Sequence, residues 1–439
     1  MSTPLHYFNY QKGVLSTGGC SLTKIAEEVG TPAYVYSAEA FLTPLQEFRQ
    51  GLQGVDHLIC FAVKSNSNLA ILKLLGDAGA GMDIVSGGEL YRARQAGISD
   101  DKIVFSGIGK TAKEMASALQ GKTGSIYSFN IESIPELHTL NRVALSLKKK
   151  ARVALRFNPD VNPKTHPYIS TGLKENKFGL HKSEILKIVH TLKELPAIEL
   201  RGISVHIGSQ LLSLSPLKDS FQKLKALLLE IEPHLIIPLE FIDLGGGVGV
   251  CYKNERAPSV QKYCDLVQSF FGKTSKQQKP LRILLEPGRV IAANSGILLT
   301  EVIYRKERPR KDFLVVDAAM NDLMRPALYG SFHDIVPLQE TKRKGKKGQL
   351  AELRKTDLVG PVCESADCFG KNRLLPRSLQ AGDRLAILSA GAYGFTMSSN
   401  YNSRPRPPEI LVENGKYRVI REREQFEDLT ARESFLTRS

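Results

Sequence analysis

Short apolar runs alternate with longer segments of helical period between about residues 30 and 290. The runs are rich in β-branched side chains, whereas the segments between them, such as 68–80 and 183–195, carry apolar residues at three- and four-residue spacing. These two patterns predict buried parallel strands joined by crossover helices. Eight strands are expected, at Leu58–Val63, Met82–Val85, Ile103–Ser106, Ile126–Phe129, Val153–Phe157, Ile203–Ile207, Phe241–Leu244 and Ile283–Leu285.

Eight strand and helix repeats of this size predict an α/β fold built on a (β/α)8 barrel, with its chemistry at the carboxyl ends of the strands. An open doubly wound sheet stays possible, because periodicity does not report whether a sheet closes. After Pro287 the helical spacing fades, and strand-like runs with turns such as Asn414-Gly415 predict a C-terminal antiparallel β domain. We expect an N-terminal segment at 1–30 packed on the β domain, the barrel at 31–290 and the β domain at 291–439.

Composition excludes several classes of protein. With 42% hydrophobic and 24% charged residues in 439, the chain is globular and not intrinsically disordered. Six cysteines in so long a chain, without a secretory signature, are expected to be reduced thiols. No run of about 18 apolar residues occurs, so we expect a cytoplasmic protein without a membrane partner.

The net charge of +15 raises the question of a polyanionic partner. The densest basic run, Lys342–Gly348 (KRKGKKG), contains two glycines and lies between strand-like stretches, which predicts a solvated hairpin loop. The other basic runs are scattered, without the clustered footprint of a nucleic-acid binder. We therefore predict no nucleic-acid partner.

Lys64 follows the apolar residues Phe61-Ala62-Val63 at the mouth of the first strand. A lysine with an apolar strand behind it can be present as a free amine that reacts with an aldehyde. A lysine at a barrel rim could equally extend into solvent for no chemical reason.

Three further strand ends carry polar or glycine-rich sequences. The sixth ends in His206-Ile207-Gly208-Ser209, the seventh in Asp243-Leu244-Gly245-Gly246-Gly247 and the eighth in Glu286-Pro287-Gly288-Arg289. Glycines let backbone N–H groups approach an anion, and the loops after strands seven and eight are the recurring phosphate site of such barrels. With an amine, a carboxylate for a ring nitrogen and a flat imidazole, the set suits pyridoxal 5′-phosphate (PLP). Taken alone, His206 could also be a buried structural imidazole.

The sequence resembles the diaminopimelate decarboxylases, which are fold-type III PLP-dependent decarboxylases, from about Tyr34 to Pro408. The motifs that carry the resemblance are FAVKSNSN around Lys64, GAGMDIVSGGELYRA (79–93), HPYISTGLKENKFGL (166–180), HIGSQ, DLGGGVGV, EPGR, RPALYG (325–330), GPVCES (360–365) and GAYG (391–394). The resemblance implies a PLP-binding barrel, a β domain and a homodimer with shared active sites. Two departures, the basic loop and Ala366 where glycine is common, touch no proposed catalytic group.

The resemblance also implies residue roles. Lys64 would hold the cofactor covalently, His206 would stack on its ring and Glu286 would pair with its ring nitrogen. Ser209, the three glycines 245–247 and Gly288-Arg289 would hold the phosphate region. The substrate-contacting positions would be Arg289, Arg325, Tyr329, Glu364 and Tyr393, with Tyr393 also near the phosphate, and Cys363 would reach the partner's site as a proton donor. No metal site is expected.

The implied reaction is decarboxylation of meso-2,6-diaminopimelate to L-lysine and CO2, the last step of bacterial lysine biosynthesis. An acid (Glu364) and a cation (Arg325) suit the ammonium and carboxylate at the distal end of this substrate. An ornithine-type decarboxylase has no use for that arginine, and an alanine racemase usually places an arginine where Glu286 stands. Arginine and carboxynorspermidine decarboxylases remain alternatives. A binding protein without activity would be expected to lack Lys64 or Cys363, and both are present.

Overall fold

The computed structural model describes residues 4–162, 176–272, 280–340 and 352–435 and divides the chain into two compact units. The first unit comprises residues 42–251 and 255–291, and the second comprises 2–41, 252–254 and 292–439. In the described parts of the chain, no helix is both long and apolar enough to cross a bilayer.

The first unit is a closed barrel of eight parallel strands, which confirms the predicted barrel over the open sheet. Closure comes from the pairing of the eighth strand with the first, with Leu284 opposite Leu58. The strands are β5 (His57–Ala62), β6 (Gly81–Ile84), β7 (Ile103–Phe105), β8 (Ser128–Ile131), β9 (Ala151–Phe157), β10 (Ile198–Val205), β11 (Phe241–Asp243) and β12 (Arg282–Leu285). Each expected strand is present at or within a few residues of its predicted place.

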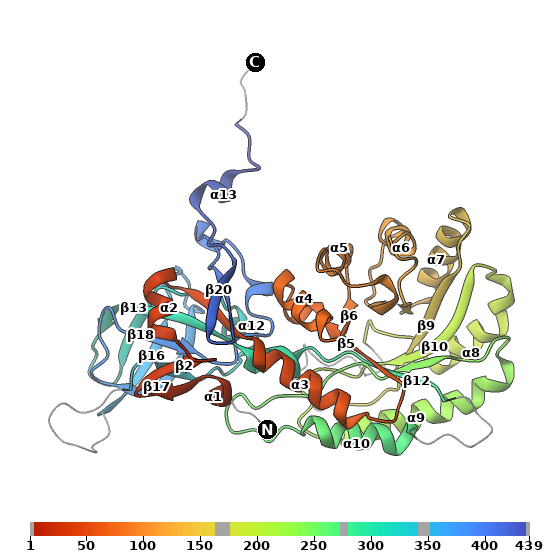
Figure 1. Cartoon of the computed structure of the whole chain (residues 1–439), viewed down its shortest axis with the longest axis horizontal. Helices are drawn as coiled ribbons and strands as arrows, with labels where there is room; N and C mark the ends of the chain where they lie inside the picture. The colour runs from red at the N-terminus through yellow and green to blue at the C-terminus, as the bar shows by residue number, and fades with distance from the viewer. Residues whose placement is uncertain (1–3, 163–175, 273–279, 341–351, 436–439) are drawn as a thin grey trace. The chain divides into compact units, whose positions relative to one another are not determined.

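Helices connect these strands on the outside of the barrel (Figure 1). They are α4 (Leu69–Asp77), α5 (Gly87–Gln95), α6 (Ala112–Leu119), α7 (Ile134–Ser146), α8 (Lys182–Thr191), α9 (Ser215–Ile231) and α10 (Val260–Phe271), and α11 (Arg289–Ala292) follows the last strand. Several begin at a side chain that caps the first turn; Asn68, for example, accepts from the backbone N–H of Ala70 at 2.9 Å. Such caps fix where each strand-end loop stops and its helix starts.

An apolar layer fills the barrel interior at the amino-terminal end of the strands. Its members are Leu58, Cys60, Val104, Ala154, Phe241 and Leu284, which are 0–6% exposed. Gly202 makes room for the ring of Phe241, because a side-chain carbon at residue 202 would lie 2.5 Å from that ring. Since alternate residues of a strand share a face, the residue two positions after each of these six also points into the barrel interior. We call the six residues the apolar floor.

The second unit contains a sheet that joins the two ends of the chain. Its strands are β4 (Ala33–Ser37), β13 (Gly296–Lys306), β14 (Asp312–Val316), β15 (Ile335–Pro337), β16 (Leu353–Val359), β17 (Cys368–Pro376), β18 (Arg384–Ile387), β19 (Glu409–Glu413) and β20 (Lys416–Arg421). A small sheet of β1 (Asn9–Gln11), β2 (Val14–Thr17) and β3 (Cys20–Ser21) precedes it, as do α1 (Pro4–Tyr7) and α2 (Leu22–Val29). The helices α12 (Arg325–Tyr329) and α13 (Phe426–Thr430) complete the unit.

The sheet of the second unit is mixed, and the expectation of a purely antiparallel domain needs this correction. Most neighbours run antiparallel, but β14 pairs with β16 and β4 with β19 in parallel. No short hairpin joins either pair, so neither is held to the antiparallel arrangement. The strand β4, which lies inside the range predicted for the barrel, is buried at all five residues and pairs with β13 and β19 here. The helix α3 (Ala38–Gly51) leads on from it.

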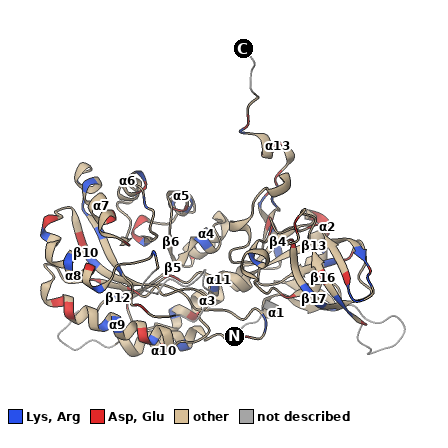
Figure 2. Cartoon of the chain, turned by 180° about the vertical axis from the view of Figure 1, so that it is seen from behind, with Lys and Arg blue, Asp and Glu red and all other residues tan. Residues whose placement is uncertain are grey.

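Lys and Arg (blue) and Asp and Glu (red) are both scattered over the barrel and over the second unit (Figure 2). Many are paired, as in the exposed ion pairs Lys73–Asp77 at 3.0 Å and Arg377–Glu352 at 3.1 Å. The basic run Lys342–Gly348, on which the solvated-loop prediction rests, lies outside the described residues. The six cysteines all lie among the described residues, and no disulfide links them.

Candidate active site

Lys64 lies where the first barrel strand ends, in a single turn of 3₁₀ helix at Val63–Ser65. Its Nζ is 2.7 Å from Oδ2 of Asp83, a carboxylate that is fully buried in β6. The lysine side chain itself is 41% exposed, so its amine can be reached from outside while the carboxylate orients it. The other oxygen of Asp83, Oδ1, has no hydrogen-bond partner among the described residues.

A buried carboxyl cluster lies above the apolar floor. Oε1 of Glu286 accepts from Oγ of Ser106 at 3.0 Å and from Nδ2 of Asn130 at 3.2 Å. The same Asn130 amide donates to Oδ2 of Asp243 at 2.8 Å, which links the fourth, seventh and eighth strands across the interior. Burial, and then the charges of Asp243 and Asp83, raise the pKa of Glu286 well above its usual range. Burial also raises the pKa of Asp243, so the cluster retains a proton where an isolated carboxyl would have lost it.

His206 presents a neutral imidazole at the end of the sixth strand. Its Nδ1 accepts from the backbone N–H of Gly246 at 3.1 Å, which places the ring proton on Nε2. Burial, with the positive charges of Arg156 and Lys64, lowers the pKa of His206 well below its usual value. The ring is therefore flat, uncharged and fixed by the glycine turn, which are the properties required of a group that stacks on an aromatic ring.

Hydrogen bonds to neighbouring side chains stabilise the glycine turn after the seventh strand. The N–H of Gly245 donates to Oδ1 of Asp243 at 2.9 Å, and the N–H of Gly246 to His206. A side chain at Gly246 would collide with the carbonyl oxygen of Glu286, so only glycine lets the two strand ends approach this closely. These two N–H groups thus shape the turn, and Gly247 continues it in the left-handed region at φ 106°.

Arg289 and Ser209 form a second polar group at the same end of the barrel. The guanidinium donates to Oγ of Ser209 from Nε at 3.2 Å and from Nη2 at 3.1 Å. Arg289 is 7% exposed and begins α11 directly after Gly288, where an added side-chain carbon would lie 3.0 Å from the Cβ of Ala62. A buried guanidinium beside a hydroxyl is suited to a phosphate dianion.

This donor set fits PLP. The amine of Lys64 suits the aldehyde, Glu286 the ring nitrogen, His206 the ring face and Arg289 with Ser209 the phosphate. Two buried oxygens, Oδ1 of Asp83 and Oδ1 of Asn130, have no hydrogen-bond partner among the described residues, as expected at a site that receives a polar ligand.

The remaining predicted site residues belong to the second unit. Arg325, at the start of α12, is 5% exposed, donates from Nη1 to Nε2 of His333 at 2.9 Å and lies over the ring of Tyr252 at 4.8 Å. Tyr329, at the other end of this helix, is partly exposed. The helix thus holds the arginine in a fixed orientation through a buried histidine.

Cys363 and Glu364 are both exposed in the loop between β16 and β17. Glu364 accepts a short hydrogen bond from the hydroxyl of Tyr401, and the backbone N–H of Cys363 donates to Oδ1 of Asn402 at 3.3 Å. Tyr393 has φ +56°, a conformation that costs free energy for a bulky side chain and that is found most often at functional sites. The motif at 166–180 lies mostly outside the described residues.

Four site residues were not predicted from the sequence: Asp83, Ser106, Asn130 and Asp243. Each is a polar residue within or directly after an apolar strand, at an inward position. Asp83 and Asp243 even lie within two of the motifs quoted above. A search for lone polar residues at alternate positions of the predicted strands would have found them.

Comparisons with known proteins give one consistent answer. The model of the family described as "Pyridoxal-dependent decarboxylase, pyridoxal binding domain" matches residues 40–293. A protein named diaminopimelate decarboxylase from Vibrio cholerae is 46% identical over 98% of this chain and 100% of its own, and one from Pseudomonas fluorescens is 47% identical over 98% and 99%. The solved diaminopimelate decarboxylase of M. jannaschii, in complex with L-lysine, superposes with a TM-score of 0.90 at 36% identity over 99% of both chains. This chain belongs to the family of pyridoxal-dependent decarboxylases.

Proposed function

We propose that this chain decarboxylates meso-2,6-diaminopimelate at its D-configured carbon, giving L-lysine and CO2, with PLP as cofactor. The observation that carries the proposal is the set of Lys64, His206, Glu286 and Arg289 at one end of the barrel. Relatives named for this reaction align over nearly the whole chain and not over the barrel alone. Two solved relatives bound to L-lysine are consistent with this product.

PLP supplies an electron sink that accepts the electrons of the broken Cα–carboxylate bond. Lys64 would hold the cofactor through its aldehyde, and Asp83, 2.7 Å away, orients the amine for this role. Glu286, whose raised pKa leaves it a proton to give, would pair with the basic ring nitrogen and supply that proton. The buried position of this pair keeps water from competing for the proton.

The other residues of the barrel position the ring. His206 would contact its ring as a neutral imidazole, since a second positive charge there would oppose protonation of the ring nitrogen. Ser209, Arg289 and the turn at Gly245–Gly247 with Gly288 hold the phosphate. These roles require that the three strand ends keep their spacing, which the hydrogen bonds of Gly245 and Gly246 support.

We also propose the residues that bind the substrate. Arg325 binds the distal carboxylate, Glu364 the distal ammonium, and Tyr329, Tyr393 and Arg289 complete the contacts. The chain acts as a homodimer in which a second copy contributes Cys363, which returns a proton to the α-carbon. The exposure of Cys363 and Glu364 is consistent with this arrangement, because a residue that serves another subunit must project from its own.

The test is a substrate panel with the purified holoenzyme. We expect equimolar CO2 and lysine from meso-diaminopimelate, and slower release of CO2 from ornithine and arginine, which lack the distal carboxylate. Faster release from either alternative would overturn the substrate assignment and leave the decarboxylase chemistry intact. Arg325→Gln should raise KM for diaminopimelate and narrow the preference over ornithine.

The expected site of action is the cytoplasm. The lack of a disulfide among the six cysteines, all of them in described residues, is consistent with a reducing compartment. Fractionation of cells that express the chain at its natural level, with activity followed in each fraction, tests this expectation.

A further inference from the structure

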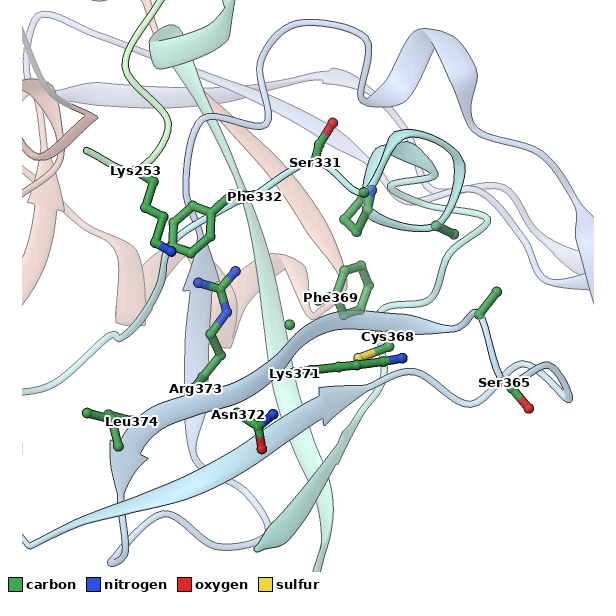
Figure 3. Close-up of a pocket in the computed structure, with 15 residues that line it drawn as sticks. Lys253, Ser331, Phe332, Ser365, Cys368, Phe369, Lys371, Asn372, Arg373 and Leu374 are labelled. Carbon is green, nitrogen blue, oxygen red and sulfur yellow. The ribbon is translucent and has the colours of Figure 1, made fainter. Parts of the chain in front are cut away.

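The second unit contains a cavity of about 670 Å³ that none of the proposed catalytic roles uses. It lies between α12, the start of β17 and the residues that follow Glu364 (Figure 3). Three cations line it, Lys253, Lys371 and Arg373, and no aspartate or glutamate is among its lining residues. The volume falls within the range of about 300 to 1,000 Å³ that is typical of small-molecule sites.

The cations are held in place by the fold. The register between β16 and β17 shifts so that Lys371 and Asn372 both lie opposite Asp357, which is a β-bulge. The N–H of Asn372, at φ +53°, donates to Oδ1 of Asp357 at 2.7 Å, which fixes the bulge. Bulges re-aim side chains and are frequent beside functional sites. Here the bulge directs the strand segment that carries Lys371 and Arg373 along the cavity wall.

Several contacts hold Arg373 in place. Its guanidinium lies 3.6 Å from the ring centroid of Phe332, and Lys253 Nζ lies 5.3 Å from the same centroid (Figure 3). A side chain at Gly370 would collide with Nε of Arg373, so glycine at this position makes room for it. Burial lowers the pKa of Arg373 from its usual value, as expected of a cation with incomplete compensation.

A chain of contacts connects the cavity to Arg325. Nη2 of Arg373 donates to the backbone carbonyl oxygen of His333 at 2.9 Å. The imidazole of His333 is fully buried, with Nδ1 2.8 Å from the carbonyl oxygen of Leu388 and Nε2 accepting from Arg325 at 2.9 Å. A displacement of Arg373 can therefore alter the position of Arg325, the arginine proposed to bind the substrate, through two hydrogen bonds of His333.

We propose that this cavity binds a small anion with at least two negative charges, such as a di- or tricarboxylate or a phosphate ester, and that its binding alters substrate affinity through His333 and Arg325. The ammonium and guanidinium groups pair with the anion, and Phe332 and Phe369 contact its apolar part. An anion that draws the guanidinium of Arg373 away from the backbone of His333 makes the His333 imidazole, which accepts from Arg325, less firmly held. L-Lysine, with its side-chain ammonium, is disfavoured here, so the site is distinct from one for the proposed product. The coupling to substrate rests on the proposed function; the binding does not.

Titration calorimetry of the holoenzyme with citrate and with inorganic phosphate, at constant ionic strength, tests the binding. We expect saturable binding of at least one of the two with Kd below about 1 mM, and a loss of at least about tenfold in affinity in both Lys371→Gln and Arg373→Gln. Lys371 is exposed, so its variant keeps the fold even where loss of the Arg373 contacts costs stability. Arg418→Gln, on the exposed face of β20 in the same unit, is the matched control and should bind as the wild type does.

Equal affinity in the wild type and both cavity variants would overturn the proposal, as would binding of chloride or lysine as tight as that of citrate. Binding confined to dilute, dissociated protein would also overturn it, because the cavity would then be covered by a second copy of the chain. In the coupled assay we expect saturating citrate to raise KM for diaminopimelate by about fivefold, at the lower end of coupling between sites, with kcat unchanged. Tight binding with no change in KM would refute the coupling. Absence of any decarboxylation would count against the proposed function and leave the calorimetry valid.

Discussion

The two ends of the barrel interior are built from the same strands and have opposite chemistry. At the amino-terminal end, Leu58, Phe241 and Leu284 contribute to an apolar floor that excludes water. Two residues further along the last two of these strands are two carboxyl groups, Asp243, which is buried, and Glu286, which is half-buried. The period of two in a β-strand therefore lets one end serve stability and the other function without a change of fold.

The contrast also explains the unusual titration of the site. A carboxyl group above an apolar floor loses hydration on one side, and the neighbouring strands bring further carboxylates close to it. This is why burial is the largest cause of the raised pKa of Glu286, followed by the charges of Asp243 and Asp83. The floor thus contributes to function by controlling the proton above it.

The largest expected effect comes from removing the amine at the functional end. Lys64→Ala should lower kcat by at least about 10³-fold, as expected when a covalent nucleophile is lost, with some loss of stability because the buried Asp83 loses its ion-pair partner. Turnover and the visible absorbance of the bound cofactor are the measurements. Lys73→Ala, on the exposed face of α4, is the control and should leave both unchanged. A variant that keeps the absorbance would remove Lys64 from its proposed role.

A substitution in the apolar floor should lower stability and leave turnover nearly unchanged. Phe241→Ala removes a fully buried ring and should lower the free energy of unfolding by about 3 to 5 kcal/mol. Chemical denaturation measures the loss, and kcat per folded molecule at low temperature should stay within a few-fold of the wild type. The same substitution at the exposed Phe426 should cost almost nothing. A loss of kcat as large as that of Lys64→Ala would mean that the two ends are not separable.

Two glycines allow a direct comparison of the two ends of the barrel interior, because the same substitution, glycine to alanine, can be made at each end. Gly202→Ala presses on the ring of Phe241 and should cost about 1 to 3 kcal/mol of stability through overpacking, with normal cofactor affinity. In Gly246→Ala the added carbon meets the backbone carbonyl oxygen of Glu286 and displaces that strand end, so this variant should weaken PLP binding as well as lower stability. Cofactor titration and thermal unfolding of both variants provide the test. If the two variants changed PLP affinity and unfolding temperature to the same extent, the separation of a stabilising end from a functional end would be contradicted.

The smallest effect concerns Glu89, which lies beside the functional end. Its carboxylate accepts from the backbone N–H of Val85 at 2.7 Å, and burial raises its pKa to about 7. A raised carboxyl pKa contributes stability that is complete below about pH 4.5, the unfolded value, and is lost as the pH rises through 7. Glu89→Gln should therefore flatten the decline in stability over this range, as followed by thermal unfolding against pH.

Glu114 provides the matched control for that titration. It also accepts backbone hydrogen bonds, from Thr111 and Gly87, but these lower its pKa. Its contribution is present at higher pH and is lost as the pH falls, which is the opposite sign. A Glu114→Gln variant that flattened the same window as Glu89→Gln would show that the effect is not specific to the buried position.

Local sequence was sufficient for the strands and for the residues at their ends. Apolar runs gave all eight barrel strands, and the candidate site residues Lys64, His206 and Glu286 were singled out because each follows such a run directly. Asp83 and Asn130 were not found, because a polar residue inside an apolar strand acquires a function only from what lies across the barrel. The parallel pairing of β4 with β19 was missed for a similar reason, since its strands are separated by most of the chain.

The sequence by itself determined the repeated strand and helix units, the polar residues that follow each strand and the motifs of the family. These are local properties, set by side-chain periodicity, capping and turn chemistry within a few residues. Tertiary structure decided that the sheet closes through β5 and β12, that Asn130 connects Asp243 with Glu286, and that His333 joins Arg373 to Arg325. Each of these depends on contacts between residues that are distant in the sequence, and hydrophobic periodicity does not report such contacts.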